Sequence, residues 1–398
     1  MKKTINLIII CLLTATNLFA QTKTFTRDYA YRASEADSKL SSRAIATTEM
    51  RNILLREVGT FIRSEQLVII KGNAQDYVEK IEAITAGIVE MKILEEKWDG
   101  ENYYIKAQMV INPKEVEQKL KEIAEDKQKL KELEESRARV KTAEDEIALL
   151  KKQITELQKG SGNEQKIEQK LTDYNKQINT LSAEEYFTKG NNASDKNDYK
   201  QAIEYYEQAV KLNPNYTDAY NNLGIAYSDI NNHEQAIVCY KKAININPND
   251  ADAYYNLGNA YYEIENYEQA IDSYKKAINI NPNYAEAYGN LGVAYKAINN
   301  YEQAIVCLKK AININPNYAE AYYILGIAYH YTGNYDQAIE YYKQAIKLNP
   351  NSVDAYNNLG SVYYDVGNEA KAIENNKKAA QLGHKGCQDW LKERGISW

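Results

Sequence analysis

The side chains that most often carry out catalysis are few and scattered in this sequence. The three histidines, His233, His330 and His384, are far apart, and His330 has no acid or thiol beside it in the chain. No phosphate-cradling glycine loop, metal-ligand spacing or nucleophile elbow occurs. Catalysis needs a convergent set of acid, base and positioning groups. We therefore predict that the chain is not an enzyme, has no catalytic residues and binds neither a metal nor a cofactor.

The cysteines and the overall charge exclude further classes of protein. Cys239, Cys307 and Cys387 are too widely spaced for a disulfide framework or a metal knuckle, so we interpret them as small helix residues. An intermolecular disulfide through an odd thiol is the alternative. The formal net charge of −6, with both signs interspersed, gives no basic surface for nucleic acid.

Residues 1–20 have the layout of a secretory signal peptide. Lys2 and Lys3 precede an apolar run, Ile5–Leu13, that is too short for a stable membrane anchor, and Ala20 offers a small residue before Gln21. No later stretch approaches transmembrane length. We expect cleavage after Ala20 and export of a chain without a membrane span, which would be periplasmic, associated with the cell envelope, or secreted.

Residues 21–112 read as a small α+β domain. The pattern predicts a helix from Ala33 to about Ser64, a short strand at Leu67–Ile70 and a second helix at Asp76–Ala86. Two strands, Ile88–Trp98 and Tyr103–Ile111, flank the turn dipeptide Asp99-Gly100. We interpret the polar cluster between Ser34 and Arg43 as a solvated helix face.

This segment resembles a leader domain found ahead of repeat arrays in exported bacterial proteins. The resemblance rests on Arg27–Tyr31, Ala33–Lys39, Thr85–Ile88 and Glu96–Gly100. The segment is also similar to small domains of outer-membrane lipoproteins and flagellar accessory proteins. Neither resemblance implies an activity.

Residues 113–182 predict a coiled coil with a break at 160–163. Val140, Ile147 and Ile154 recur every seven residues, and Ala143 and Leu150 occupy the companion positions. Two arrangements are open: residues 114–159 pair with a second copy, or the chain turns at the glycines and folds back. The Leu and Ile content of the seam favours self-association, and a charged single helix used as a spacer is a third possibility.

From Ala183 to Gly386 the sequence repeats every 34 residues. Each unit has two helical stripes, and a proline within an Asn-Pro-Asn triplet ends five of the units; these prolines are Pro214, Pro248, Pro282, Pro316 and Pro350. An Asn or Asp followed three residues later by Gln predicts a capping box at the start of the second helix. A mid-helix glycine such as Gly224 predicts close approach of the partner helix at Ala236 and Ala243.

The spacing resembles the tetratricopeptide repeat (TPR) family. That resemblance implies a mainly α protein in which six TPR hairpins at 183–386 form an α-solenoid, closed by a capping helix at 387–398. The coiled-coil segment and the small α+β domain come before it.

In that family the first helices line a concave groove, and the same position of successive units carries Asn222, Asn256, Asn290 and Asn358 here. This row resembles an asparagine ladder that grips the main chain of an extended peptide. The alternative is that these asparagines were simply copied with the repeat. The predicted groove residues are Asn222, Asn256, Asn290, Asn358, Tyr255, Asn259, Tyr262, Tyr323 and His330.

The groove also carries an acidic residue at the second position of every unit and only one basic residue, Lys296. A neutral or basic segment therefore fits better than an anionic tail. Our leading hypothesis is an exported adaptor that holds another protein or an extended peptide. The alternative is an architectural part of the envelope, in which the N-terminal domain anchors the chain while the coil and the repeats act as an oligomerising spacer.

Overall fold

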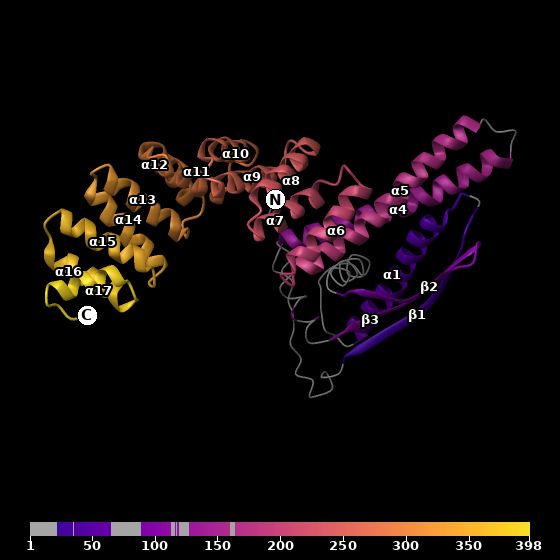
Figure 1. Ribbon diagram of the computed structural model, residues 1–398, viewed down its shortest axis with the longest axis horizontal. Coiled ribbons are helices and arrows are strands. Elements are labelled where there is room, and N and C mark those ends of the chain that lie inside the picture. The colour runs from indigo at the N-terminus through magenta and orange to yellow at the C-terminus, as the bar shows by residue number, and fades with distance from the viewer. Residues whose placement is uncertain are drawn as a thin grey trace, which may run out of the picture. The chain divides into compact units, whose positions relative to one another are not determined.

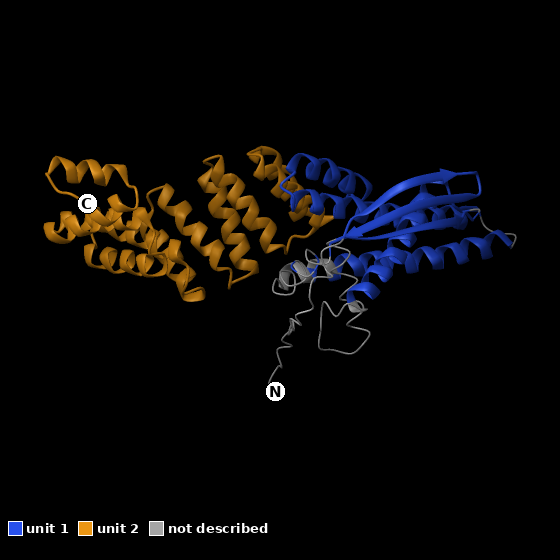
Figure 2. Cartoon of the chain, turned by 90° about the horizontal axis from the view of Figure 1, so that it is seen from below, with its two compact units in different colours: residues 1–215 blue, residues 216–398 orange. Residues whose placement is uncertain are grey.

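The computed structural model describes residues 22–34, 36–64, 89–112, 116, 118, 127–159 and 164–398 (Figure 1). The predicted signal peptide, the strand at 67–70, the helix at 76–86 and the break at 160–163 lie outside these residues. The chain forms two compact units, residues 1–215 and 216–398 (Figure 2). The predicted fold class, a mainly α chain of repeated helix hairpins with a small N-terminal α+β domain, is confirmed.

Unit 1 contains a three-stranded antiparallel sheet with the order β1-β3-β2. Its strands are β1 (Lys23–Arg32), β2 (Met91–Trp98) and β3 (Asn102–Ile111). The hairpin at Asp99-Gly100 is confirmed: Gly100 has a φ of 106°, and the Asp99 carboxylate accepts the Asn102 N–H at 2.7 Å. Strand β1 was not predicted, although the alternation of Phe25, Tyr29 and Tyr31 with exposed residues fits a half-buried strand.

Helix α1 (Lys39–Ser64) covers one face of this sheet. Met50, Leu54 and Val58 are fully buried against inward-facing side chains of β3 such as Ile105 and Met109. Figure 1 shows α1 between the sheet and the pair formed by α4 (Lys127–Lys159) and α5 (Glu164–Ser194). Unit 1 is therefore a layered domain whose core lies on both sides of α1.

Two predictions about the start of α1 are wrong. The helix begins at Lys39, six residues later than predicted, because the Asp37 carboxylate accepts the Ser34 N–H at 2.7 Å and forms a turn there. The polar cluster is not a solvated face. The Asp37 side chain is fully buried, accepts hydrogen bonds from the Tyr31 and Tyr174 hydroxyls and lies 3.2 Å from the Lys151 ammonium.

The apolar seam of α4 packs against α5 of the same chain. One buried cluster contains Ala143, Ile147 and Ile154 of α4 together with Tyr174 and Ile178 of α5. Ala44 of α1 also belongs to it. Of the two open arrangements, the structure has the fold-back. The physical reason is that α5 carries its own apolar stripe at the spacing of the α4 seam, so the two stripes bury each other within one molecule.

Helix α5 is continuous from this pair into the first repeat. Its last turns form a hairpin with α6 (Tyr199–Leu212), where a Cβ at Gly190 would lie 2.4 Å from the Tyr206 ring. The first hairpin therefore belongs to unit 1, and the boundary between the compact units lies at 215/216. Because α5 belongs both to the pair with α4 and to the first hairpin, no linker separates that pair from the hairpin.

Unit 2 consists of five hairpins and a terminal helix. Each second helix packs against the first helix of the following hairpin, and the joined cores run along the unit. The first helices are α7 (Thr217–Asp229), α9 (Ala251–Glu263), α11 (Ala285–Ala297), α13 (Ala319–Tyr331) and α15 (Val353–Asp365). The second helices are α8 (His233–Ile246), α10 (Tyr267–Ile280), α12 (Tyr301–Ile314), α14 (Tyr335–Leu348) and α16 (Glu369–Gln381). The terminal helix is α17 (Lys385–Glu393), in which Cys387 and Leu391 are buried.

The turns within the hairpins follow the predicted capping only in part. The Asn232 side chain accepts the Gln235 N–H at 3.3 Å, which is the expected cap, and four other second helices have the same bond. The backbone N–H of Asn232 donates to the Tyr227 carbonyl at 2.9 Å, so the reciprocal bond from Gln is replaced by a main-chain bond. In the turn before α14, Asn334 makes no side-chain cap.

The mid-helix glycines make room for a ring. A Cβ at Gly224 would lie 2.5 Å from Cε1 of Tyr240, and the same contact recurs at Gly258 and Gly326. The prediction of close approach by the partner helix is therefore right, but the group that approaches is a tyrosine and not Ala236 or Ala243. A ring that lies flat over the glycine fills more of the interface than the alanine pair would.

Candidate binding surface

The predicted binding residues of unit 2 lie on its first helices. Each first helix packs against the first helix of the next hairpin as well as against its own partner, so α7, α9, α11, α13 and α15 form one continuous face. We call this face of unit 2 the first-helix face.

The asparagines of the proposed ladder join neighbouring helices to one another. The Asn256 amide donates to Asn221 Oδ1 at 3.3 Å. The Asn290 amide donates to Asn259 Oδ1 at 2.8 Å and to the Tyr255 hydroxyl at 3.2 Å. The side chains that make these three hydrogen bonds, four asparagines and Tyr255, are all half-buried. The amide nitrogens therefore have partners within the stack, which the sequence did not indicate.

The last ladder position behaves in the same way. The Asn358 amide donates to the Tyr323 hydroxyl at 3.1 Å, and its Oδ1 accepts from the Asn357 amide at 3.2 Å. Asn222 lies half-buried at the same position of α7, while Ile324 is buried and interrupts the row. The asparagines of this row thus form hydrogen bonds that join neighbouring hairpins.

Two acceptor atoms of the row are still available to a ligand. Oδ1 of Asn256 and Oδ1 of Asn290 accept no hydrogen bond from any residue that the structure describes. An amide whose nitrogen is held by a neighbour has a fixed orientation, so its oxygen is preorganised to accept an N–H. At Asn290 both amide N–H groups are used within the stack, which leaves its oxygen, whereas Asn256 uses one N–H group in this way.

His330 has an acidic partner that the sequence analysis missed. Its Nε2 lies 2.7 Å from Asp365 Oδ2, and its ring packs edge-on against Tyr335. The two residues are 35 positions apart, which is one repeat plus one residue, so the pairing follows from the stacking of α13 and α15. No group of three His, Cys, Asp or Glu side chains that could hold a metal occurs within the described ranges.

Tyrosines concentrate at the N-terminal ends of α9, α11 and α13. Tyr255 and Tyr284 have ring centroids 5.0 Å apart, and the Tyr284 hydroxyl donates to Asp252 at 2.8 Å. Tyr318 lies over Gly289, where a Cβ would be 2.7 Å from the ring. The sequence analysis missed Tyr284 and Tyr318 because they precede the helices, although a tyrosine before the first helix also recurs at Tyr216.

The acidic side chains of neighbouring units act on these rings. Burial first, and then the Glu320 carboxylate, raise the pKa of Tyr318 to about 12. Burial also raises the pKa of Tyr255, and the carboxylates of Glu286 and Glu320 raise it further. Glu286 and Glu320 lie in the first turns of α11 and α13, two residues after Tyr284 and Tyr318, so their negative charges lie at the same helix ends as these rings.

Charge is segregated between the two sets of helices in unit 2. The first helices carry one lysine, Lys296, against eight carboxylates, a formal charge of −7. These carboxylates are Asp218, Asp229, Asp252, Glu263, Glu286, Glu320, Asp354 and Asp365. The second helices have a formal charge of +3.

The lysines of the second helices have a packing role besides solvation. The ammonium groups of Lys241, Lys275 and Lys309 each lie 5.4–5.5 Å from a tyrosine ring centroid on the next first helix. Each cation–π contact of this kind is worth roughly 0.5–1 kcal/mol at an exposed site, so these lysines also link neighbouring hairpins.

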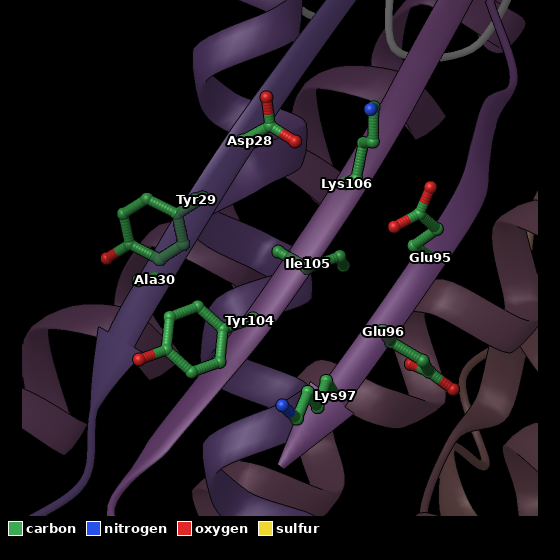
Figure 3. Close-up of a pocket in the computed structure, with 9 residues that line it drawn as sticks. All are labelled: Asp28, Tyr29, Ala30, Glu95, Glu96, Lys97, Tyr104, Ile105 and Lys106. Atoms are coloured by element: carbon green, nitrogen blue, oxygen red, sulfur yellow. The ribbon is translucent and has the colours of Figure 1, made fainter. Parts of the chain in front are cut away.

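Unit 1 has a shallow depression of about 710 Å³ on the sheet (Figure 3). Figure 3 shows Tyr104 and Lys106 on β3, Asp28 on β1, and Glu95 and Lys97 on β2. Acids and lysines alternate across it, and no pair of these side chains forms the geometry of a nucleophile and its base. This depression does not carry a functional assignment.

The repeats match known families. Family models described as TPR repeat match residues 190–231, 227–265, 258–299 and 328–367. Models described as Tetratricopeptide repeat match residues 285–318, 307–340 and 353–382. Residues 190–382 are tetratricopeptide repeats. No helix of the described residues is both long and apolar enough to cross a membrane.

Individual proteins are similar over parts of the chain. The uncharacterized protein MJ0572 of Methanocaldococcus jannaschii is 42% identical over 48 residues, which are 12% of this chain; the chain spans about half (56%) of the length of that relative. The crystal structure of MamA is 34% identical, with a TM-score of 0.40, over 42% of this chain and 96% of MamA. YrrB, described as a TPR protein with an unusual peptide-binding site, is 26% identical, with a TM-score of 0.43, over 48% of this chain and 99% of YrrB.

Proposed function

We propose that unit 2 is a non-catalytic scaffold that binds a neutral or basic extended segment of another protein on its first-helix face. The observation that carries this proposal is the segregation of charge: the first helices have a formal charge of −7 and the second helices +3. Complementary potential steers association and excludes like-charged partners. An acidic segment would be repelled by the first-helix face.

The carboxylates also have a role that needs no ligand. A negative side chain in the first turn of a helix is favoured by the helix dipole, and Asp252, Glu286 and Glu320 all lie in first turns. This role does not account for Asp229, Glu263 or Asp365, which lie at the C-terminal ends of first helices where a carboxylate is unfavourable. Negative charge at both ends of the same helices supports a role in binding.

The side chains between these charges suit an extended main chain. The Asn256 and Asn290 oxygens are held in place as acceptors, and half-buried tyrosines such as Tyr255 and Tyr323 offer rigid amphipathic surface at low entropic cost. A segment bound there would present N–H groups to the asparagines and basic side chains to the carboxylates.

The second candidate is an architectural role, and the continuity of α5 favours it. The same helix packs on α4 and forms the first repeat with α6, so force or orientation would pass along it without a hinge. In this proposal the N-terminal domain anchors the chain in the envelope and the repeats serve as a spacer. Deleting residues 216–398 should leave localisation unchanged, and loss of localisation would count against this role.

We also propose that the chain is exported and becomes periplasmic, envelope-associated or secreted. The supporting observation is the sequence of residues 1–20, with two lysines before a short apolar run. N-terminal sequencing of the purified protein tests this, and an intact Met1 on the mature chain would contradict it.

A selection experiment tests the scaffold proposal. The full chain is used to select from a random peptide display library, and we expect enriched peptides with net positive charge. The variant Asp252→Asn/Glu286→Gln/Glu320→Gln should lose most of this binding. The matched control, Asp272→Asn/Glu302→Gln/Glu340→Gln, removes the same number of charges from second helices and should retain it. No enrichment, or equal loss in both variants, would refute the proposal.

A further inference from the structure

The densest group of aromatic and acidic side chains on the first-helix face lies at the N-terminal ends of α9, α11 and α13. Tyr255 and Tyr284 are in ring contact at 5.0 Å, and Tyr318 occupies the space that Gly289 leaves open. The three rings lie at the N-terminal ends of successive first helices: Tyr255 is in the second turn of α9, and Tyr284 and Tyr318 directly precede α11 and α13. No other part of this face combines three half-buried tyrosines with carboxylates in this way.

The carboxylates beside these rings are not neutralised. Glu286 and Glu320 are exposed, and neither forms an ion pair with a described residue. Asp252 is different, because the Tyr284 hydroxyl already donates to it at 2.8 Å. Glu286 and Glu320 lie in the first turns of α11 and α13, two residues after Tyr284 and Tyr318. Two free negative charges thus lie at the same helix ends as rings whose faces also attract cations, since the faces of aromatic rings carry negative charge.

A guanidinium group fits this combination of side chains. It is planar, stacks on tyrosine rings and donates several N–H groups in a fork that matches carboxylates. An ammonium group also fits, but as a compact and strongly hydrated charge it gains less from stacking. A neutral or acidic side chain would leave both carboxylates without a partner.

The unusual residue of the site is Gly289. The same position of the neighbouring units holds Asn221, Tyr255, Tyr323 and Asn357, so glycine is the exception here. A Cβ at Gly289 would lie 2.7 Å from Cε1 and 2.8 Å from the hydroxyl of Tyr318. The missing side chain therefore lets the Tyr318 ring lie against α11.

We infer that Tyr255, Tyr284 and Tyr318, with Glu286 and Glu320, form a subsite that binds one arginine side chain of the bound protein segment. This inference rests on the proposed scaffold function and specifies which residue the segment must carry where it contacts α9, α11 and α13. The first-helix face is acidic along its whole length, so general attraction between opposite charges would hold a basic residue anywhere on it. The subsite instead predicts a preference for arginine at one place.

The test uses three labelled probes that differ at one position. Each is a nine-residue Gly/Ser peptide with blocked ends and a central arginine, lysine or citrulline; citrulline keeps the shape of arginine and removes its charge. Binding to the full chain is measured by fluorescence anisotropy at low salt. We expect the arginine peptide to bind about three- to tenfold more tightly than the citrulline peptide, with the lysine peptide between them.

Matched variants locate the effect. Glu286→Gln/Glu320→Gln should abolish the difference between arginine and citrulline, whereas Asp218→Asn/Asp354→Asn, which removes two charges from the same helical position outside the subsite, should preserve it. Gly289→Ala, which displaces Tyr318, should reduce the difference without changing charge. Circular dichroism of each variant verifies that the helices are intact.

The outcomes separate this inference from the scaffold proposal. Equal binding of the arginine and citrulline peptides, equal losses in the two charge variants, or no binding of the arginine peptide at millimolar concentration would overturn the subsite. Enrichment of basic peptides in the library selection would then still support the scaffold. Failure of that selection, together with an arginine preference in the probes, would refute the scaffold as stated and leave only a side-chain site.

Discussion

A tight contact between a glycine of the first helix and a tyrosine ring of the second recurs in three hairpins of unit 2, at Gly224, Gly258 and Gly326. In the hairpin α9–α10, a Cβ added at Gly258 would lie 2.6 Å from Cε1 and 2.7 Å from Cδ1 of Tyr274. Carbon atoms pack at about 3.5–4.0 Å, so the ring would have to retreat by about 1 Å. Tyr274 is 1% exposed and has no open side to move into.

The expected cost of Gly258→Ala follows from three contributions. Overpacking of a rigid site costs about 1–3 kcal/mol. Movement of the ring also weakens the hydrogen bond from the Tyr274 hydroxyl to Asn259, which is 2.8 Å long and worth about 1 kcal/mol. The better helix propensity of alanine offsets about 1 kcal/mol. We therefore expect the free energy of unfolding to fall by about 2 kcal/mol.

Urea denaturation of the full chain, followed by circular dichroism, measures this change. Hydrogen exchange of the α9 and α10 amides shows whether the effect is local, since neighbouring elements of one protein can open separately. The control is the same substitution in a Tyr274→Ala background, where the ring is gone and Gly258→Ala should stabilise by up to about 1 kcal/mol. If Gly258→Ala does not destabilise the wild type, or has the same effect in both backgrounds, the contact with the ring is not what requires glycine.

Two further predictions concern other parts of the chain. Ile154→Asp should lower the free energy of unfolding by about 3 kcal/mol or more, because it buries a carboxylate between α4 and α5. The control Leu149→Asp changes a side chain that is 54% exposed and should be nearly neutral. Light scattering should give the same mass for both variants as for the wild type, and a loss of mass in Ile154→Asp would instead indicate pairing between copies. In unit 2, burial raises the pKa of Tyr240 and Tyr318 to about 12, so the stability they provide should be complete below pH 10 and lost as the pH rises to about 12. A titration of tyrosinate absorbance, recorded with circular dichroism, checks this, and ionisation of every tyrosine near pH 10 with the helices intact would contradict it.

The positions of helices and turns in the repeats could be predicted from residue types alone. Asparagine before each second helix and the proline after it act on their immediate neighbours, so their effect on the backbone does not depend on the rest of the chain. The Asp99-Gly100 hairpin is local in the same sense. The turn at Ser34–Asp37 before α1 is local, but the burial of Asp37 depends on Tyr174 and Lys151, which are more than a hundred positions away.

The candidate site was less accessible to sequence analysis. The 34-residue period places Asn256 and Asn290 on one face, but it does not say that Asn290 will donate to Tyr255 and Asn259 of the preceding unit. The pair His330–Asp365 and the stacking of Tyr284 on Tyr255 also depend on how far one helix is rotated against the next. These contacts were found only once that rotation was known.

The amino-acid sequence determined by itself that this protein is an array of helix hairpins with an acidic row on the first helix of every unit, since helix periodicity and first-turn charge are properties of a few adjacent residues. Only the tertiary structure decided which groups those helices bring together: the fold-back of α5 on α4, the tyrosine rings against Gly224, Gly258 and Gly326, and the ring contact between Tyr255 and Tyr284. The reason is physical. Contacts between helices depend on packing distance and side-chain conformation, which are set by all the neighbours at once.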